Sequence, residues 1–196
     1  LSALFIFTAL ALLFAPIFIL IFAPGFYFDI QKQDLAVSLL RIMFPYLALI
    51  SLVAFAAGIQ NSHNKFSIPA ITPLIFNLSL IGSAWLVAPK IDIPVMALAW
   101  GVLLAGFLQL LFQIAPLATI KKIPVPKIDF QNPGVKKFFI LILPAIVAGG
   151  IAQINLLIDT IFASLLITGS PTWLYVSDRL IQFPMGIFAI AIGTVL

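Results

Sequence analysis

Three polar residues near the C-terminal end of the chain could bind a charged ligand. Asp178, Arg179 and Gln182 lie within the apolar run 172–196, and Pro184 follows them closely. In a helix, Gln182 shares a side with the residues three and four positions before it. Pro184 leaves a backbone carbonyl of the same turn without its donor. The arginine offers a planar fork of N–H donors that fits phosphate. The pattern predicts one wall of a polar cavity that receives an anionic group.

A second charged residue, Asp159, lies in the preceding apolar run, 136–167. About four residues join the two runs, so we expect two antiparallel neighbouring helices. At ~1.5 Å per residue, Asp159 and Arg179 then lie roughly 10–12 Å from the ends that this turn joins. Two interpretations stay open. The two charges form a buried ion pair that fixes the packing, or both face an internal cavity and bind a ligand.

The composition indicates the environment in which these charged residues lie. The chain has 196 residues, of which 63% are hydrophobic and 8% are charged. A soluble domain normally has about a quarter of its residues charged. The composition therefore predicts an integral membrane protein. A charge within the bilayer costs at least ~2.5 kcal/mol, which favours a functional role for Arg179 and leaves both interpretations of Asp159 open.

Six apolar runs are long enough to cross a bilayer as helices. They cover residues 1–23, 38–59, 68–88, 94–118, 136–167 and 172–196. A proline interrupts each run and is expected to kink it: Pro16, Pro45, Pro73, Pro116, Pro144 and Pro184. The runs are too long and too uniformly apolar for the strands of a membrane barrel. We predict an all-α polytopic membrane bundle with six transmembrane helices.

The basic residues indicate the orientation of this bundle, because cytoplasmic connections carry more lysine and arginine. Six lysines lie on one side: Lys65, Lys121, Lys122, Lys127, Lys136 and Lys137. The other side has Lys32, Arg41 and Lys90. The first side is predicted to be cytoplasmic, with both chain ends there. The long basic connection 119–135 is either a solvated linker or a site for anionic lipids, and it divides four helices (1–118) from two (136–196).

Several classes of chemistry are excluded or disfavoured. The chain has no cysteine, and its one histidine, His63, lies in a connection, so a thiolate or His/Cys metal site is not expected. We find no Ser-His-Asp arrangement, no paired carboxylates in a helix core and no glycine-rich phosphate loop. We therefore expect neither an enzyme nor a nucleic-acid partner.

Three stretches and their order carry a family resemblance. They read "GIQNSHNKFSIPAITPLIFNLSLIG", "ALAWGVLLAGFLQLLFQ" and "QINLLIDTIFASLLITGSPTWLYVSDRLIQFPMGIFAIAIGT". The chain resembles, over essentially its whole length, the MurJ (MviN) lipid II flippase family of the multidrug/oligosaccharidyl-lipid/polysaccharide exporter superfamily. The resemblance implies a two-lobed transporter in the bacterial cytoplasmic (inner) membrane, with these six helices as the third to eighth of fourteen. The connection 119–135 would join the lobes.

The resemblance also implies roles for individual residues. Arg179, in "SDRLIQFP", matches a cavity arginine that engages the diphosphate of lipid II, and Asp178 and Gln182 flank it. Gln182 departs from the glutamate of some members, which leaves a role for a carboxylate there open. Asp159, in "LLIDTIFAS", matches a Na⁺ ligand of some members. No cofactor is implied apart from Na⁺ as a coupling ion.

The expected function is that of one segment of a lipid II flippase, which moves its substrate between leaflets by alternating access. Lipid II, the surrounding membrane lipids and the helices missing from this chain are the expected partners. Two alternatives remain. One is an exporter of another polyprenyl-linked saccharide, and the other is a non-transport membrane scaffold in which Asp159 and Arg179 form a structural pair.

Overall fold

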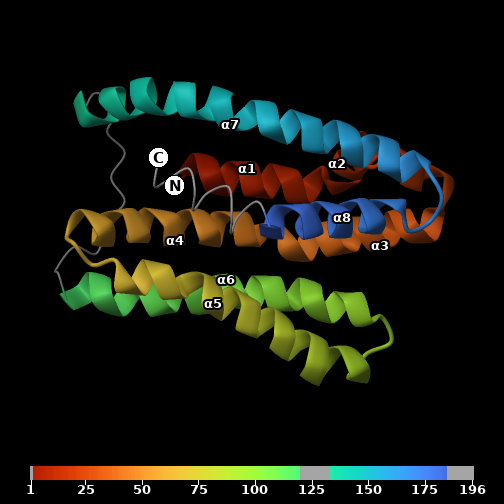
Figure 1. Ribbon diagram of the computed structural model, residues 1–196, viewed down its shortest axis with the longest axis horizontal. Coiled ribbons are helices and arrows are strands. Elements are labelled where there is room, and N and C mark those ends of the chain that lie inside the picture. The colour runs from red at the N-terminus through yellow and green to blue at the C-terminus, as the bar shows by residue number, and fades with distance from the viewer. Residues whose placement is uncertain (1, 120–132, 185–196) are drawn as a thin grey trace. The chain divides into compact units, whose positions relative to one another are not determined.

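The computed structural model describes residues 2–119 and 133–184, and every regular element in these ranges is a helix (Figure 1). This confirms the predicted all-α fold. The α-helices are α1 (Ser2–Leu13), α2 (Ala15–Phe22), α3 (Ile30–Met43), α4 (Pro45–Ser62), α5 (Ser67–Gly82), α6 (Pro94–Thr119), α7 (Pro133–Leu165) and α8 (Ser170–Pro184). The short elements are the 3₁₀ turns η1 (Pro24–Phe28) and η3 (Ala88–Lys90) and the π-helical turn η2 (Ser83–Val87).

Four helices are long and apolar enough to cross a membrane, by length and composition: Ile30–Ser62, Ser67–Lys90, Pro94–Thr119 and Ile140–Leu165. The bent pair of α1 and α2 makes a fifth if it counts as one span. The predicted run 172–196 is described only in part, as α8, because residues 185–196 lie outside the described ranges. The chain is therefore polytopic, and the number of six spans stays a prediction.

Prolines determine where two of the predicted runs break. The run 1–23 divides at Phe14, two residues before Pro16, and its halves meet at an angle of 80°. The second span divides at Phe44, just before Pro45, and it begins at Ile30 rather than at the predicted residue 38. Each proline lacks the N–H that the carbonyl four residues earlier would accept, so both breaks have the expected cause. The prolines of α5, α6 and α7 lie inside continuous helices.

The chain divides into two compact units. The first comprises Leu1–Pro16 and Asp34–Ile128, and the second comprises Ile17–Gln33 and Asp129–Leu196. Most of the predicted linker 119–135 lies outside the described residues. The predicted division into lobes 1–118 and 136–196 stays a prediction.

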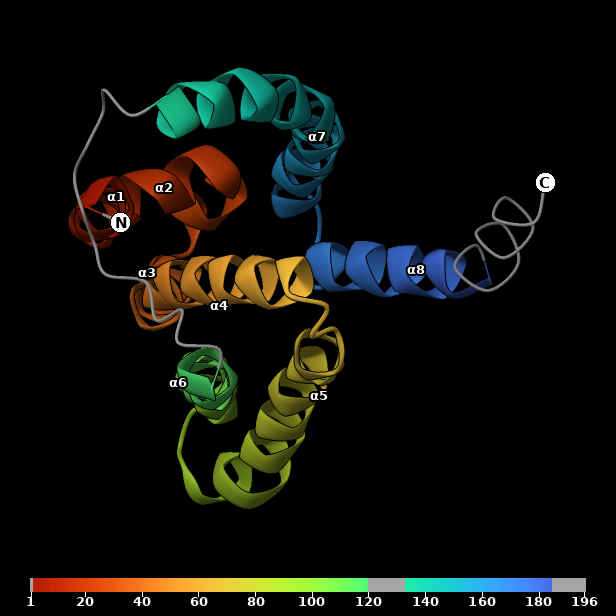
Figure 2. The same ribbon diagram turned by 90° about the vertical axis from the view of Figure 1, so that its left-hand side faces the viewer.

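In the first unit, α6 is the central helix and packs along both α4 and α5 (Figure 2). Small residues of α6 form the buried face, among them Ala97, Ala105 and Gly106. A Cβ at Gly106 would lie 2.8 Å from the Tyr46 ring and 2.9 Å from a Leu49 methyl group. Glycine therefore allows α4 and α6 to approach closely, as small residues do between membrane helices.

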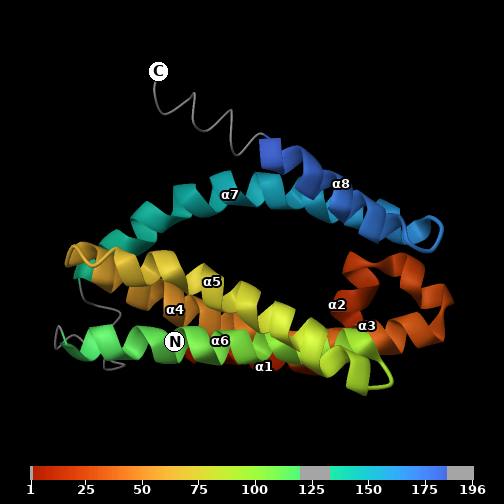
Figure 3. The same ribbon diagram turned by 60° about the horizontal axis from the view of Figure 1, so that its bottom comes forward.

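In the second unit, α7 and α8 are joined by a four-residue turn, and α8 runs back in the opposite direction (Figure 3) while it diverges from α7 beyond the turn (Figure 2). Gly169 in this turn has a φ of +104°, a conformation that favours glycine. This confirms the predicted pair of antiparallel neighbours. The turn η1 packs against the end of α7, where the Gly25 N–H donates to Ser164 Oγ at 3.1 Å. A Cβ at Gly25 would overlap the Ser164 carbonyl, so this contact also requires glycine.

Candidate functional site

The polar patch predicted near the C-terminal end forms one side of α8. Arg179 Nη1 donates a hydrogen bond to Gln182 Oε1 at 3.3 Å, as their spacing of three residues predicts. The guanidinium also lies over the Tyr175 ring, 5.0 Å from its centroid. This cation–π contact orients the guanidinium without neutralising its charge. The sequence reasoning missed Tyr175, although its position four residues before Arg179 places it on the same side of the helix.

The charge of Arg179 is free to meet a ligand. Its side chain and that of Gln182 are exposed, and Asp178 is half-buried. Within residues 2–119 and 133–184, the one ion pair joins Asp29 and Lys32. Arg179 therefore has no carboxylate partner in the described chain. One long hydrogen bond and one ring contact leave most of its five N–H donors available.

Asp159 lies on α7 and is exposed. It forms no ion pair with Arg179 in the described part of the chain, so the interpretation as a structural pair gains no support from the geometry. No group of three or more His, Cys, Asp or Glu side chains among the described residues could hold a metal ion. The role of Asp159 as a Na⁺ ligand stays a prediction.

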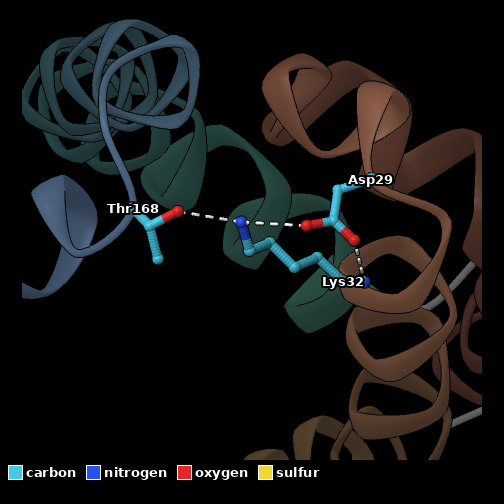
Figure 4. Close-up of polar contacts among 3 residues, drawn as sticks. All are labelled: Asp29, Lys32 and Thr168. Atoms are coloured by element: carbon cyan, nitrogen blue, oxygen red, sulfur yellow. Dashed lines mark hydrogen bonds and ion pairs between the residues drawn. The ribbon is translucent and has the colours of Figure 1, made fainter.

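A second polar cluster connects the start of α3 with the turn between α7 and α8 (Figure 4). Lys32 Nζ lies 3.0 Å from Asp29 Oδ2 and donates to Thr168 Oγ1 at 2.9 Å. Asp29 Oδ1 accepts the Lys32 backbone N–H at 3.1 Å. The side-chain hydrogen bond from Lys32 is the main cause that lowers the pKa of Asp29. The spacing of three residues was a local signal for the pair of Asp29 and Lys32, but none existed for Thr168, which is 136 residues from Lys32.

A third polar group lies in the interior of the first unit and joins three helices. Gln60 of α4 donates through Nε2 to Gln113 Oε1 of α6 at 2.6 Å. Gln113 Nε2 donates in turn to Thr72 Oγ1 of α5 at 3.0 Å, and Gln109 Nε2 donates to the Thr72 carbonyl at 3.1 Å. Tyr46 completes the group with a long bond from its hydroxyl to Gln109 Oε1, 3.4 Å. We call these five residues the glutamine network.

The glutamine network is deeply buried. Gln60 and Gln113 have no exposed surface, and Gln109 and Thr72 are 2% and 4% exposed. A groove of about 340 Å³ between α4 and α5 reaches Tyr46, Thr72, Gln109 and Gln113. The remaining walls are mostly aliphatic and aromatic: Ile50, Val53, Ala54, Ala57, Pro69, Pro73 and Phe76, with Asn77. This arrangement holds helices together and carries no charge with which to bind an anion.

The comparisons with known proteins agree with the resemblance seen in the sequence. The family model described as "Lipid II flippase MurJ" matches residues 1–196. A probable lipid II flippase MurJ from Haemophilus influenzae is 40% identical over 96% of this chain and 38% of its own length. The lipid II flippase MurJ from Burkholderia cenocepacia is 40% identical over 89% of this chain and 34% of its own length.

A probable lipid II flippase MurJ from Vibrio cholerae is 44% identical over 84% of this chain and 31% of its own length. The chain thus spans about a third of the length of these relatives. The family model matches every residue of the chain, including the residues of the patch on α8. The chain therefore belongs to the MurJ family of lipid II flippases.

Proposed function

We propose that this chain is a segment of a lipid II flippase that moves the lipid-linked peptidoglycan precursor across the bacterial cytoplasmic membrane. The family match over residues 1–196 and relatives that carry this name support the proposal. The remaining helices of the full-length protein would complete the transport path.

The observation that carries the proposal at the level of residues is the unpaired guanidinium of Arg179. The diphosphate that links a lipid to a saccharide is esterified at both ends and is a dianion, and a guanidinium binds its oxygens through two parallel hydrogen bonds. Tyr175 and Gln182 hold the Arg179 side chain from two directions and leave N–H donors free. Asp178 and Gln182 lie within one turn of Arg179 and would contact the same head group.

The mechanism that we propose is alternating access. The diphosphate head group is held in a central cavity while the lipid tail stays in the bilayer, and two states of the protein open the cavity to opposite sides. Binding of Na⁺ at Asp159 would bias these two states, because a ligand shifts an equilibrium toward the state that it binds more tightly. Membrane lipids surround the protein throughout this cycle.

The test is rescue of cells depleted of their own lipid II flippase by the full-length parent protein. We expect rescue by the unchanged protein and failure of Arg179→Ala, with equal amounts of both in the membrane. Arg179→Lys should also fail or rescue weakly, because an ammonium lacks the planar fork. Lys65→Ala, which removes an exposed cation from a connection, is the matched control and should rescue.

Two outcomes would contradict the proposal in different ways. Full rescue by Arg179→Ala would show that this guanidinium is not needed for the substrate. Failure of the unchanged protein, when it is present in the membrane, would mean that the substrate is another lipid-linked saccharide. Transfer of labelled lipid II across vesicles that contain the purified parent would then decide directly whether lipid II is moved.

A further inference from the structure

Arg41 is a second arginine within a predicted span. It lies in α3, eleven residues after the start of the span Ile30–Ser62 and well before its end. At ~1.5 Å per residue, it is roughly 16 Å along the helix axis from Ile30. The first turns of this helix are polar, and its apolar part covers residues 35–59. Arg41 therefore lies six residues, or roughly 9 Å, inside the apolar part, where a long side chain can reach the lipid head groups.

The first contact of Arg41 fixes the direction of its side chain. Its Nε donates a long hydrogen bond to the Leu12 carbonyl of α1, at 3.4 Å. In an unbroken helix this carbonyl would accept the N–H of residue 16, but that residue is Pro16 and has none. One N–H of the guanidinium thus satisfies a carbonyl at the bend between α1 and α2. The rings of Phe7 and Phe44 also pack together, with centroids 5.9 Å apart.

The positive charge of Arg41 has no counterion in the described part of the chain. The ion pair found there joins Asp29 and Lys32, and no carboxylate lies within 4.0 Å of Arg41. The nearest acid along the same helix is Asp34, two turns away. Arg41 is exposed, and four of its five N–H donors form no described hydrogen bond. An oriented, unneutralised guanidinium inside a span requires an anion.

We propose that Arg41 binds a phosphate group of a lipid through the two terminal nitrogens of its guanidinium. These nitrogens form a planar fork that matches two phosphate oxygens, and Nε is already held by Leu12. A lipid is the ligand that reaches an exposed side chain within a span from the bilayer. The phosphate belongs either to the diphosphate of the transported lipid or to a phospholipid head group, and the first case rests on the function proposed above.

The experiment measures binding to the purified full-length parent in detergent. Farnesyl diphosphate is the probe for a lipid diphosphate, and phosphatidylglycerol is the probe for a phospholipid. Arg41→Gln removes the charge but keeps an N–H donor for the Leu12 carbonyl. Lys65→Gln makes the same charge change at an exposed connection and is the matched control. We expect Arg41→Gln to weaken binding of at least one probe by about tenfold, and Lys65→Gln to change neither.

The pattern of losses identifies the phosphate. Weaker binding of farnesyl diphosphate alone assigns Arg41 to the substrate, and weaker binding of phosphatidylglycerol alone assigns it to a phospholipid. The second result would stand even if the proposed transport of lipid II were wrong. Unchanged binding of both probes by a folded Arg41→Gln protein would overturn the proposal. If that variant does not fold, Arg41→Lys replaces it, and unchanged affinities of Arg41→Lys for both probes would overturn the proposal equally.

Discussion

The glutamine network of the first unit and the Arg179 patch of the second use similar side chains for opposite purposes. In the network, buried amides meet partners on other helices, with bonds as short as 2.6 Å. In the patch, an exposed guanidinium contacts two residues of its own helix, through one bond of 3.3 Å and one ring. The network connects α4, α5 and α6, whereas the hydrogen bond and the ring contact of Arg179 within residues 2–119 and 133–184 stay on α8.

This difference separates polar groups that stabilise the helix packing from those that we propose bind a ligand. A buried amide without a partner costs about 1–3 kcal/mol, so the bonded members of the network depend on one another. The network is not fully satisfied, because Gln60 Oε1 is buried and has no partner among the described residues. An exposed charge that contacts only its own helix contributes little to folding, because its removal leaves no partner unsatisfied. Mutations in the two regions should therefore affect different measurements.

The largest expected effect on stability is that of Gln113→Leu. The change removes the side-chain acceptor of Gln60 and the donor to Thr72, and it leaves Gln60 only a long bond of 3.4 Å to the Gln113 carbonyl. We therefore expect the free energy of unfolding to fall by about 2 kcal/mol. Thermal unfolding of the full-length protein in detergent measures it. Leu111→Ala, at a 63% exposed position of the same helix, is the control. If both variants unfold at the same temperature, the network does not stabilise the helices.

The double variant Gln60→Leu with Gln113→Leu sharpens the same comparison. Replacing both amides leaves neither of them unpaired, and Thr72 Oγ1 keeps its bond to the Ile68 carbonyl. We therefore expect the double variant to be less destabilised than the sum of the single variants, by about 1 kcal/mol. The measurement is a double-mutant cycle of unfolding free energies. Simple additivity would mean that Gln60 and Gln113 act independently.

Asp29 and Lys32 form an intermediate case, because they are charged and partly exposed but have partners. The hydrogen bond from Lys32 lowers the pKa of Asp29 in the folded protein below its ordinary value. Its contribution to stability is therefore complete above the pKa of the unfolded chain and is lost as the pH falls through the lower folded pKa. An NMR titration of the Asp29 carboxyl group should show a higher pKa in Lys32→Met. An unchanged pKa would exclude the hydrogen bond as its cause.

The smallest expected effect on stability is that of Arg179→Gln. Because the side chain is exposed and bonds only Gln182, we expect the free energy of unfolding to change by less than about 0.5 kcal/mol. The same variant should fail to support transport if the proposed function is right. A large loss of stability would mean that Arg179 is a structural residue, as Gln60 and Gln113 are. The proposed difference between the patch and the glutamine network would then be wrong.

The sequence predicted the helices well where the length of an apolar run or the position of a proline determines where a helix begins and ends. The run 94–118 corresponds to α6, Pro94–Thr119, and the breaks near Pro16 and Pro45 follow from the missing N–H groups. The start of α3 was missed, because its first turns, "IQKQD", are polar and read as a connection. Hydropathy alone does not distinguish a polar helix end from a loop.

The contacts of the candidate sites also divide into some that the sequence could predict and others that it could not. The contact between Arg179 and Gln182 follows from their spacing on one helix and was predictable. The glutamine network and the contact of Lys32 with Thr168 were missed, because both depend on the register between helices far apart in sequence. The spacing of Gln109 and Gln113 on one face of α6 was a signal for a shared polar partner, but it could not identify Gln60 or Thr72 as that partner.

The glutamine network also has a consequence for the order in which the chain enters the membrane. The groups that satisfy Gln60 of α4 and that bond Thr72 of α5 lie on α6, which the ribosome makes last of the three. Until α6 emerges, the Gln60 amide has no bond to another helix and faces lipid or the insertion machinery. The three helices should therefore leave the translocon together rather than one by one, and a nascent chain stopped before Gln109 should remain in contact with it.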